Sequence, residues 1–300
     1  MLDLTRLRVL VAVARTGSVT AAAEALHYAQ PSVSHHLAKL ETEVGVPLVQ
    51  RVGRGIRLTD AGRLLVARAE EILGQVESAH AELAAHAGLR TGRVRLAAFP
   101  SALATLVPVA AARLAAEHPE IELALTEAEP PEALAALRNA EVDVALVFEH
   151  DDVPAGDRRN TTMTMLLEEP LYLVAPHPDH QGGPRGELAN YAGARWIAGC
   201  QRCRAHLLAA SAAAGFTPDI AFETDDYVAV QALVAAGLGV STLPGLALIA
   251  NRHPGVRVRR LAGERRRVLA ATYGRPPASL PAQALLAALT DTITTPTWPR

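Results

Sequence analysis

SVTAAAEALHYAQPSVSHHLAKLETEVGVPLVQR, residues 18–51, is the stretch that decides how the N-terminal part of this chain folds. Ser18 is a residue type preferred at a helix N-cap, and the alanine-rich run after it favours a helix. Residues 27–29 are long enough only for a turn. Pro31 then suits the first turn of a second helix, where its missing N–H costs little. The stretch therefore predicts two short helices joined by a tight turn.

The second predicted helix has an apolar face and a polar face. Val33, Leu37, Leu40 and Val44 recur at helical spacing and are expected to pack on the preceding helix. The polar side chains can reach base edges or phosphates in a DNA major groove. An ordinary amphipathic surface helix is the alternative that this helix alone leaves open. The residues predicted to contact DNA are Gln30, Ser32, Ser34, His35, His36 and Lys39.

The residues after this helix predict a β-hairpin that carries arginines. Arg51, Arg54 and Arg57 alternate with Gly53 and Gly55. Such a hairpin would place its arginines on DNA phosphates, which fix the position of a protein on the duplex. A solvated arginine-rich turn is the alternative. The first sixty residues carry seven basic and five acidic residues, an excess of +2, so clustering rather than net charge supports the DNA interpretation.

The order and spacing of these residues resemble the LysR-type transcriptional regulators. The similarity is strong over the first sixty-odd residues and includes Gln30-Pro31, Leu40-Glu41 and the stretch GRGIRLTDAG at residues 53–62. One position departs from the family, which often has serine where this chain has Ala29, so a capping hydroxyl is missing. The resemblance implies an α/β multidomain protein with an N-terminal winged helix-turn-helix, a linker helix and a C-terminal two-lobed effector domain similar to periplasmic binding proteins.

The resemblance also implies a function. We expect a homodimer or homotetramer that binds double-stranded promoter DNA, contacts RNA polymerase and changes its activity when a small effector binds the C-terminal cleft. No cofactor is expected. The competing hypothesis is a small-molecule binding protein whose N-terminal domain mediates only partner contacts. It predicts no salt-dependent affinity for DNA.

A long helix is predicted to start at Thr59 or Asp60 and to end near His86. Apolar residues recur along it in steps of four and three, which is typical of a coiled-coil seam. A second copy of the chain would then pair with this helix, whereas packing on its own domain is the alternative. The predicted seam consists of Leu65, Ala69, Ile72, Val76, Ala79 and Leu83.

Beyond a predicted hinge at residues 88–92, strands and helices alternate. The pattern βαβαβ over residues 94–148 predicts a parallel sheet. The expected domains are 1–58 for DNA binding, 59–87 for the linker helix and 88–300 for effector binding. Within the last, lobe 1 is expected at about 92–162 and 266–300, and lobe 2 at about 163–265.

The effector site is expected where strands lead into helices, because ligands of open α/β sheets bind beyond the carboxyl ends of strands. One such point is Phe99-Pro100-Ser101, and the opposing one is Gly199-Cys200-Gln201-Arg202. Two helix N-termini that face one cleft favour a small anionic effector. Capping or packing is the alternative role for each residue singly. The predicted effector-binding residues are Phe99, Pro100, Ser101, Thr126, Phe148, Gly199, Cys200, Arg202 and Thr242.

Cys200 and Cys203, the two cysteines of the chain, form a Cys-x-x-Cys motif at a predicted helix start. The helix N-terminus, Arg202 and Arg204 are expected to lower the thiol pKa. This leaves three roles open: pocket lining, a redox-responsive pair, or soft-metal binding together with His206. The main hypothesis includes no metal site.

Bulk properties exclude other classes of protein. The 300 residues carry a net charge of −2 and contain no apolar run long enough for a bilayer and no signal-peptide pattern. No nucleotide-binding, hydrolase or metalloprotease motif occurs, so we expect no enzymatic activity. The expected location is the cytoplasm.

Overall fold

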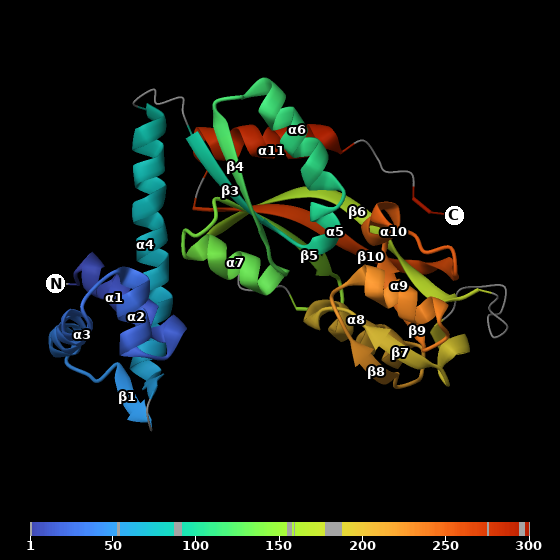
Figure 1. Cartoon of the computed structure of the whole chain (residues 1–300), viewed down its shortest axis with the longest axis horizontal. Coiled ribbons are helices and arrows are strands. Elements are labelled where there is room, and N and C mark those ends of the chain that lie inside the picture. The colour runs from blue at the N-terminus through green and yellow to red at the C-terminus, as the bar shows by residue number, and fades with distance from the viewer. Residues whose placement is uncertain are drawn as a thin grey trace. The chain divides into compact units, whose positions relative to one another are not determined.

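The computed structural model describes residues 2–52, 55–86, 92–154, 158, 160–177, 188–274, 276–293 and 298–299 (Figure 1). The chain divides into two compact units. Unit 1 comprises Met1–Ala87 and Arg138–Glu141, and unit 2 comprises Gly88–Leu137 and Val142–Arg300. None of the described helices has the length and apolarity needed to cross a membrane.

Unit 1 contains the two predicted helices and the predicted hairpin. The Ser18 hydroxyl accepts a hydrogen bond from the Ala21 N–H and so caps the second helix of the chain. Gly17 and Gly45 follow helices with left-handed backbone (φ 64° and 75°), which glycine adopts without a steric penalty. The elements are α1 (Leu4–Thr16), α2 (Val19–Leu26), α3 (Gln30–Val44), β1 (Val49–Val52), β2 (Gly55–Leu58) and α4 (Asp60–His86).

The helices of unit 1 pack through two apolar clusters. Val33 of α3 joins the cluster formed by α1 and α2, whereas Leu37 and Leu40 join the cluster that reaches α4. Glu41 follows on α3, and its carboxylate accepts hydrogen bonds from the N–H groups of Leu48 (2.7 Å) and Val49 (3.1 Å). These contacts fix the connection between α3 and the hairpin.

The start of α4 is held tightly against the chain before it. The Thr59 hydroxyl accepts from the Gly62 N–H at 2.9 Å and donates to the Pro47 carbonyl at 2.8 Å. A Cβ added at Gly62 would lie 2.0 Å from the Leu48 carbonyl oxygen. A residue with a side chain at position 62 would clash with this backbone carbonyl.

The predicted seam of α4 needs a correction. Ala69 is fully buried and packs with Leu65 and Ile72 against α1 and α3 of the same chain. Leu83, near the other end, is 67% exposed. The first half of the seam therefore packs on its own domain, because α1 already covers that face, and only the second half leaves apolar surface uncovered.

Unit 2 begins with the predicted βαβαβ pattern. Strand β3 pairs in parallel with β4 and with β5, as expected. The first helical segment of this pattern forms two helices, divided at Ala104 and Thr105. The elements are β3 (Gly92–Ala98), α5 (Pro100–Leu103), α6 (Leu106–Glu117), β4 (Ile121–Glu127), α7 (Pro130–Arg138) and β5 (Val144–His150).

Two long antiparallel strands, β6 (Thr161–Pro176) and β10 (Val256–Tyr273), run through both lobes (Figure 1). The sheet has the order β4-β3-β5-β10-β6-β9-β7-β8, so the lobes share one continuous sheet. Only the apolar parts of these strands, near 171–175 and 268–273, have a strand pattern in the sequence, because the residues between them are charged. The expected lobe limits at 162/163 and 265/266 lie inside the two strands.

The second lobe packs its helices on the far end of this sheet. Its apolar clusters include Trp196 and Tyr191 on one side and Tyr172 and Val234 on the other. Helix α11 (Leu280–Thr292) returns to pack against α6 in the first lobe. The remaining elements are η1 (Leu188–Tyr191), β7 (Arg195–Ala198), α8 (Gln201–Ala213), β8 (Asp219–Glu223), α9 (Tyr227–Ala235), β9 (Val240–Pro244) and α10 (Gly245–Ala250).

Candidate DNA interface and effector pocket

Helix α3 presents its polar residues on the surface and buries its apolar ones. Gln30, Ser32, His35 and Lys39 are exposed, and Ser34 and His36 are partly exposed. The Gln30 side-chain amide donates to the Ser34 hydroxyl at 3.0 Å, which orients the amide at the start of the helix. The six residues predicted to contact DNA thus share one helix, with its apolar residues facing inward.

His36 is the most constrained of these residues. Its ring lies 6.3 Å from that of Tyr28 and 6.1 Å from that of His35. Its Nδ1 atom is buried and has no hydrogen-bond partner. The ring is therefore positioned by packing, which suits a side chain that must present one edge in a fixed direction.

The missing cap of α3 costs less than its sequence suggests. No side chain caps the helix at Ala29, as the departure from the family pattern predicted. An N-cap side chain bonds the second or third N–H of a helix. Here the second residue is Pro31, which has no N–H, and the Ser32 N–H donates to the Ala29 carbonyl at 2.9 Å. Fewer backbone N–H groups at the start of α3 are therefore left without an acceptor.

The hairpin forms where the wing was predicted. Strands β1 and β2 pair in antiparallel fashion, with Arg51 opposite Ile56. Arg57 is exposed on β2. Arg54 and the side chain of Arg51 lie outside the described residues, so Arg57 is the wing arginine that the structure places.

A pocket lies between the lobes of unit 2. It is lined by the ends of β3, β5 and β9 and by the starts of α5, α8 and α9. Seven of the nine predicted effector-binding residues line it together, namely Phe99, Pro100, Ser101, Phe148, Gly199, Cys200 and Thr242.

The other two predicted residues lie elsewhere. Arg202 lines a neighbouring pocket that shares Cys200, Glu129 and Asp225 with the first one. Its side chain is largely buried and donates to the Pro154 carbonyl at 3.3 Å. Thr126 is exposed on β4 and lines neither pocket, because β4 is the edge strand of the sheet.

The sequence analysis missed the charged group of the pocket, Arg266. Its guanidinium donates from Nε to Glu169 at 2.6 Å and from Nη2 to the Ser101 hydroxyl at 2.9 Å. Arg266 is 3% exposed and Glu169 is fully buried. The guanidinium also lies 4.1 Å from the centre of the Phe148 ring. A glutamate in the apolar run of β6 and an arginine two residues before that of β10 were the available signals.

Glu129 is the second pocket residue that the sequence analysis missed. Burial, together with the nearby Cys200, raises the pKa of its carboxyl to about 9. Its Oε2 atom is buried without a hydrogen-bond partner. At neutral pH the side chain is therefore a neutral acid, able to donate a hydrogen bond and adding no negative charge to the pocket.

The two cysteines form a contact inside the pocket wall. Both are free thiols, and their Sγ atoms lie 3.1 Å apart in the first turn of α8. The contact with Cys203 and burial raise the pKa of the Cys200 thiol, contrary to the lowering expected from the helix N-terminus. The same contact lowers the pKa of Cys203, which burial opposes. Both thiols also line the effector pocket, so they form part of its wall.

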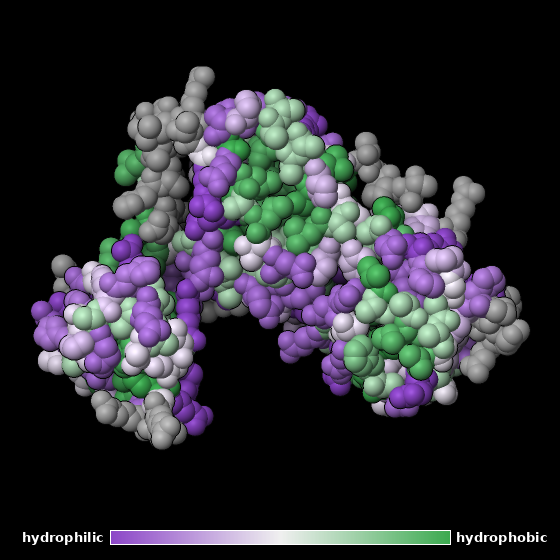
Figure 2. Space-filling view, viewed as in Figure 1, coloured by the Kyte–Doolittle hydropathy of each residue, from purple (hydrophilic) through white to green (hydrophobic). Residues whose placement is uncertain are grey.

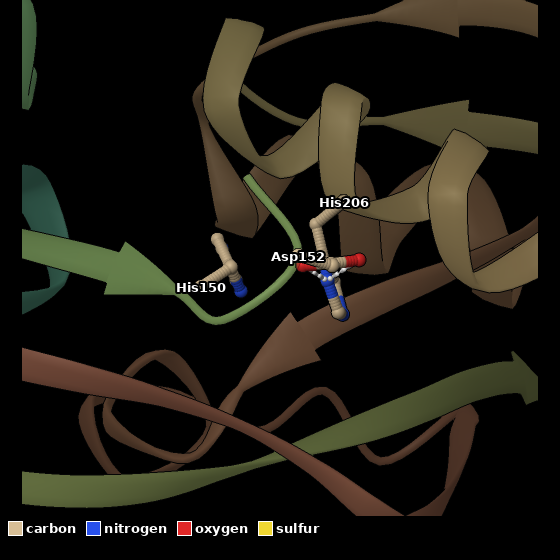
Figure 3. A group of neighbouring side chains, drawn as sticks. All are labelled: His150, Asp152 and His206. Carbon is tan, nitrogen blue, oxygen red and sulfur yellow. Dashed lines mark hydrogen bonds and ion pairs between the residues drawn. The ribbon is translucent and has the colours of Figure 1, made fainter. Parts of the chain in front are cut away.

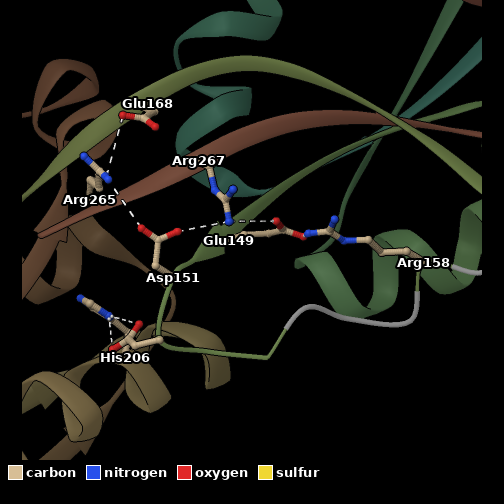
Figure 4. Close-up of polar contacts among 8 residues, drawn as sticks. Glu149, Asp151, Arg158, Glu168, His206, Arg265 and Arg267 are labelled. Atoms are coloured by element: carbon tan, nitrogen blue, oxygen red, sulfur yellow. Dashed lines mark hydrogen bonds and ion pairs between the residues drawn. The ribbon is translucent and has the colours of Figure 1, made fainter.

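Ion pairs lie beside the junction between the lobes (Figure 4). Glu149 of β5 pairs with Arg158 and, at 3.8 Å, with Arg267 of β10. Arg267 also pairs with Asp151 at 3.2 Å. These contacts hold the chain that leaves β5 against β10. Next to them, burial lowers the pKa of the His150 imidazole to about 2, so that the ring is neutral.

Comparison with known proteins agrees with both units. The family model of bacterial regulatory helix-turn-helix proteins of the lysR family matches residues 4–63, and that of the LysR substrate binding domain matches residues 87–294. The chain is 30% identical to the HTH-type transcriptional regulator YfeR of Shigella flexneri, over 82% of this chain and 79% of that protein. It is 31% identical to the nitrogen assimilation regulatory protein nac of Escherichia coli (strain K12), over 80% and 77% of the two chains.

A solved structure extends the similarity to nearly the whole chain. A full-length OxyR variant from Pseudomonas aeruginosa matches with a TM-score of 0.68 and 25% identity, over 99% of this chain and 96% of that one. The two family models together cover the helix-turn-helix and the lobes that enclose the pocket. The chain therefore belongs to the LysR family and is a DNA-binding transcriptional regulator with an effector-binding domain.

Proposed function

We infer that the exposed face of α3 reads promoter DNA and that the pocket of unit 2 controls this binding through a small anionic effector. The observation that carries the inference is the pocket itself, which has residues of both lobes around one buried guanidinium. A ligand that binds the two lobes differently in two arrangements shifts the balance between them. Regulation then needs no catalysis, and we assign the chain no enzymatic step.

The DNA contacts divide by chemistry. Gln30, Ser32, Ser34, His35 and His36 contact base edges, whereas Lys39 and the wing arginines Arg51, Arg54 and Arg57 contact phosphates. The exposure of Lys39 and Arg57 and the fixed ring of His36 support this division. Residues 1–58 thus form the DNA-binding domain, 59–87 the linker helix and 88–300 the regulatory domain. Acting on promoters with RNA polymerase, the protein works in the cytoplasm.

The pocket favours an effector with a carboxylate or phosphate group. Arg266, which is ion-paired with Glu169, supplies guanidinium N–H donors, and the N-terminus of α8 adds its helix dipole. Glu129, held neutral, donates a hydrogen bond rather than repelling an anion. Six of the predicted residues, Phe99, Pro100, Ser101, Phe148, Gly199 and Thr242, shape the rest of the wall. Thr126, which lies outside the pocket, is left out of this assignment.

A homodimer or homotetramer fits the exposed apolar surface. Leu83 of α4 is two-thirds exposed, and Val109 of α6 and Leu125 of β4 are more than half exposed. Figure 2 shows apolar surface over this part of α6 and β4. Exposed apolar patches on a soluble protein favour association, and β4 is an edge strand. Two copies would present two recognition helices to a two-fold operator.

Footprinting of the full-length protein on the DNA upstream of its own coding sequence tests the DNA assignment. We expect a protected region with partial two-fold symmetry and an affinity that falls steeply with salt. His36→Ala should relax the base preference by roughly 1–3 kcal/mol of discrimination at one position. Arg57→Ala should weaken all sequences evenly and reduce the salt slope by about 1.

His177→Ala is the matched control, because it removes an exposed imidazole from unit 2. It should leave protection and salt slope unchanged. Wild-type affinity and base preference in both His36→Ala and Arg57→Ala would contradict the contact assignment. The absence of salt-dependent binding to genomic fragments would instead support the small-molecule binding protein.

A further inference from the structure

Two histidines and an aspartate meet at the junction between the lobes, outside the effector pocket (Figure 3). His150 is the last residue of β5, Asp152 follows it, and His206 lies on α8. Among the residues that the structure describes, they form a group whose potential ligand atoms all lie within 4.8 Å of one another. Cys200 and Cys203 are not part of this group. His206 therefore lies with His150 and Asp152, and not with the two cysteines that the sequence suggested as its partners in metal binding.

His150 is a buried polar side chain without a partner. It is 3% exposed, and neither ring nitrogen forms a hydrogen bond. The backbone of Arg265 lies beside the ring without reaching hydrogen-bonding geometry. A buried polar group left unpaired costs about 1–3 kcal/mol. A neutral imidazole with a free lone pair is also the form that binds a metal ion.

His206 is oriented by carboxylates on both sides of its ring. Its Nδ1 lies 2.7 Å and 2.9 Å from the two oxygens of Asp152, and its Nε2 lies 3.2 Å from Glu264 Oε2. Metal-binding histidines usually donate their second N–H to a carboxylate, which fixes the tautomer. Glu264 is placed for this role at Nε2, and Nδ1 contacts the Asp152 carboxylate, so an ion at Nδ1 would lie between these two ligands.

The cluster needs a small adjustment to close on an ion. A tetrahedral ion with bonds of about 2.1 Å separates its ligand atoms by roughly 3.4 Å. The ligand atoms lie within 4.8 Å of one another, so the widest separation must shrink by up to about 1.4 Å, whereas the 2.7 Å between His206 Nδ1 and Asp152 must widen by about 0.7 Å. The rings of His150 and His206 are stacked at 4.2 Å with 9° between their planes. One ring must rotate out of the stack for both lone pairs to point at one ion.

The surrounding charges do not forbid a cation. Arg202 and Arg266 lie close enough to act on His150 electrostatically. Arg266 is paired with Glu169 at 2.6 Å, which offsets its charge. The carboxylates of Asp152 and Glu264 face the cluster directly and are each about one-third exposed, which leaves a path from solvent.

We propose that His150, Asp152 and His206 bind a divalent transition-metal ion of the zinc class, with Glu264 as the partner that orients His206. Two imidazoles and one carboxylate are a ligand set that zinc accepts, and water can complete the tetrahedron. The site is distinct from the effector pocket, and binding of the ion requires no chemical reaction.

The ion would join the two lobes next to the pocket. His150 belongs to β5 and His206 to α8, and the ring of Phe148, which lines the pocket, lies 5.6 Å from that of His150. The Cys200–Cys203 turn and His206 share α8. Metal binding would therefore restrict the movement of α8 relative to β5, the same two elements that line the effector pocket.

Metal titration of the full-length protein tests the proposal. After EDTA treatment and buffer exchange, Zn²⁺ is titrated in competition with a chromophoric chelator, and Co²⁺ is added separately to record its visible absorption. We expect about one ion per chain and Co²⁺ bands of a four-coordinate site. His150→Gln and His206→Gln should each lower the affinity by more than about 100-fold, and Glu264→Gln by about 10–100-fold.

Three controls make each outcome decisive. His177→Gln, an exposed imidazole elsewhere in unit 2, should keep the wild-type affinity. Cys200→Ser/Cys203→Ser should also keep it. Zn²⁺ should raise the melting temperature of the wild type but not of Asp152→Asn, whose side chain is exposed enough to leave folding intact. The proposal is wrong if the wild type binds no Zn²⁺, or if both histidine variants bind as tightly as the wild type. It is also wrong if the cysteine variant alone loses the ion.

Discussion

The DNA-binding unit and the effector-binding unit differ in how many polar side chains they bury. Among the described residues of unit 1, Glu71 of α4 is the single buried polar or charged side chain, at 9% exposure. The described part of unit 2 buries eleven, namely Ser101, Glu149, His150, Glu169, Arg202, His206, Ser211, Gln231, Ser241, Arg266 and Thr272. Unit 1 keeps its polar groups outside for a partner, whereas unit 2 keeps them inside around sites of its own.

Helices α3 and α8 show the same difference locally. Helix α3 carries His35, His36 and Lys39, and α8 carries Arg202 and His206. On α3 these side chains are exposed or partly exposed to solvent, because the apolar residues on the opposite face pack into two clusters. On α8 Arg202 and His206 are buried at the lobe junction. A buried charge requires partners that a solvated one does not, so the two units should respond very differently to single substitutions.

The largest expected effect comes from breaking the buried ion pair of unit 2. Arg266→Met leaves Glu169 fully buried without its partner, and breaking such a pair costs about 3–5 kcal/mol. The free energy of unfolding should fall by that amount in a denaturant titration. Trp196 and Trp298, the two tryptophans of the chain, both belong to unit 2, so their fluorescence reports on that unit.

Arg265→Met provides the matched control for this substitution. Arg265 is 56% exposed and pairs with Asp151 and Glu168 only at 3.8 Å and 3.9 Å. Exposed pairs contribute about 0–1 kcal/mol. Equal losses in the two variants would show that burial does not distinguish these arginines. The double change Arg266→Met/Glu169→Leu should recover part of the loss, because it removes the stranded charge.

An intermediate effect is expected from the pH dependence of Glu129. Its folded pKa of about 9 lies above the ordinary value of 4.5. Between these two values the unfolded chain loses the proton and the folded chain keeps it, so stability is highest at low pH and falls as pH rises. Relative to Glu129→Gln, the wild type should lose roughly 2–3 kcal/mol of unfolding free energy between pH 6 and pH 8.

The measurement compares the two proteins by denaturant unfolding at both pH values. Glu132→Gln, an exposed carboxylate in the first turn of α7, is the control and should follow the wild type. A difference between wild type and Glu129→Gln that stays constant with pH would show that Glu129 is ionised in the folded chain.

The smallest effects are expected from the helix caps of unit 1. Ser18→Ala removes the acceptor of the Ala21 N–H and should cost about 0.5–1 kcal/mol. Ala29→Ser should gain only a few tenths of a kcal/mol, because Pro31 has no N–H to receive the new cap. Hydrogen exchange of peptides from α2 and α3 measures both. A gain from Ala29→Ser as large as the loss from Ser18→Ala would contradict the cap argument.

The predictions that succeeded from sequence share a local cause. Ser18, Pro31 and Gly45 act on their own helix ends, and the spacing of Val33, Leu37 and Leu40 fixes one face of α3. The βαβαβ order likewise follows from neighbouring segments. The seam of α4 failed in part for the same reason: spacing identifies an apolar face, but Ala69 packs against α1, a contact distant in sequence.

The pocket contains both residues that sequence patterns predicted and residues that they missed. Strand-to-helix junctions led to seven residues that line one cavity, because the topology of a parallel sheet places such junctions at one edge. Arg266 and Glu169 come from two long strands whose charged stretches had no strand pattern. Thr126 ends a strand too, but at the sheet edge, and strand order cannot be read from strand ends alone.

Caps, turns and periodicity predict the helix-turn-helix, the hairpin and the alternation of strands and helices, because they act over a few residues. Three features depend on the folded chain: β6 and β10 join both lobes in one sheet, Glu129 faces Cys200, and His206 meets His150 and Asp152. His206 and Asp152 lie 54 positions apart along the chain, and β6 pairs with β10 across still longer separations. Burial and charge pairing at that range depend on how the whole sheet closes, which no local pattern records.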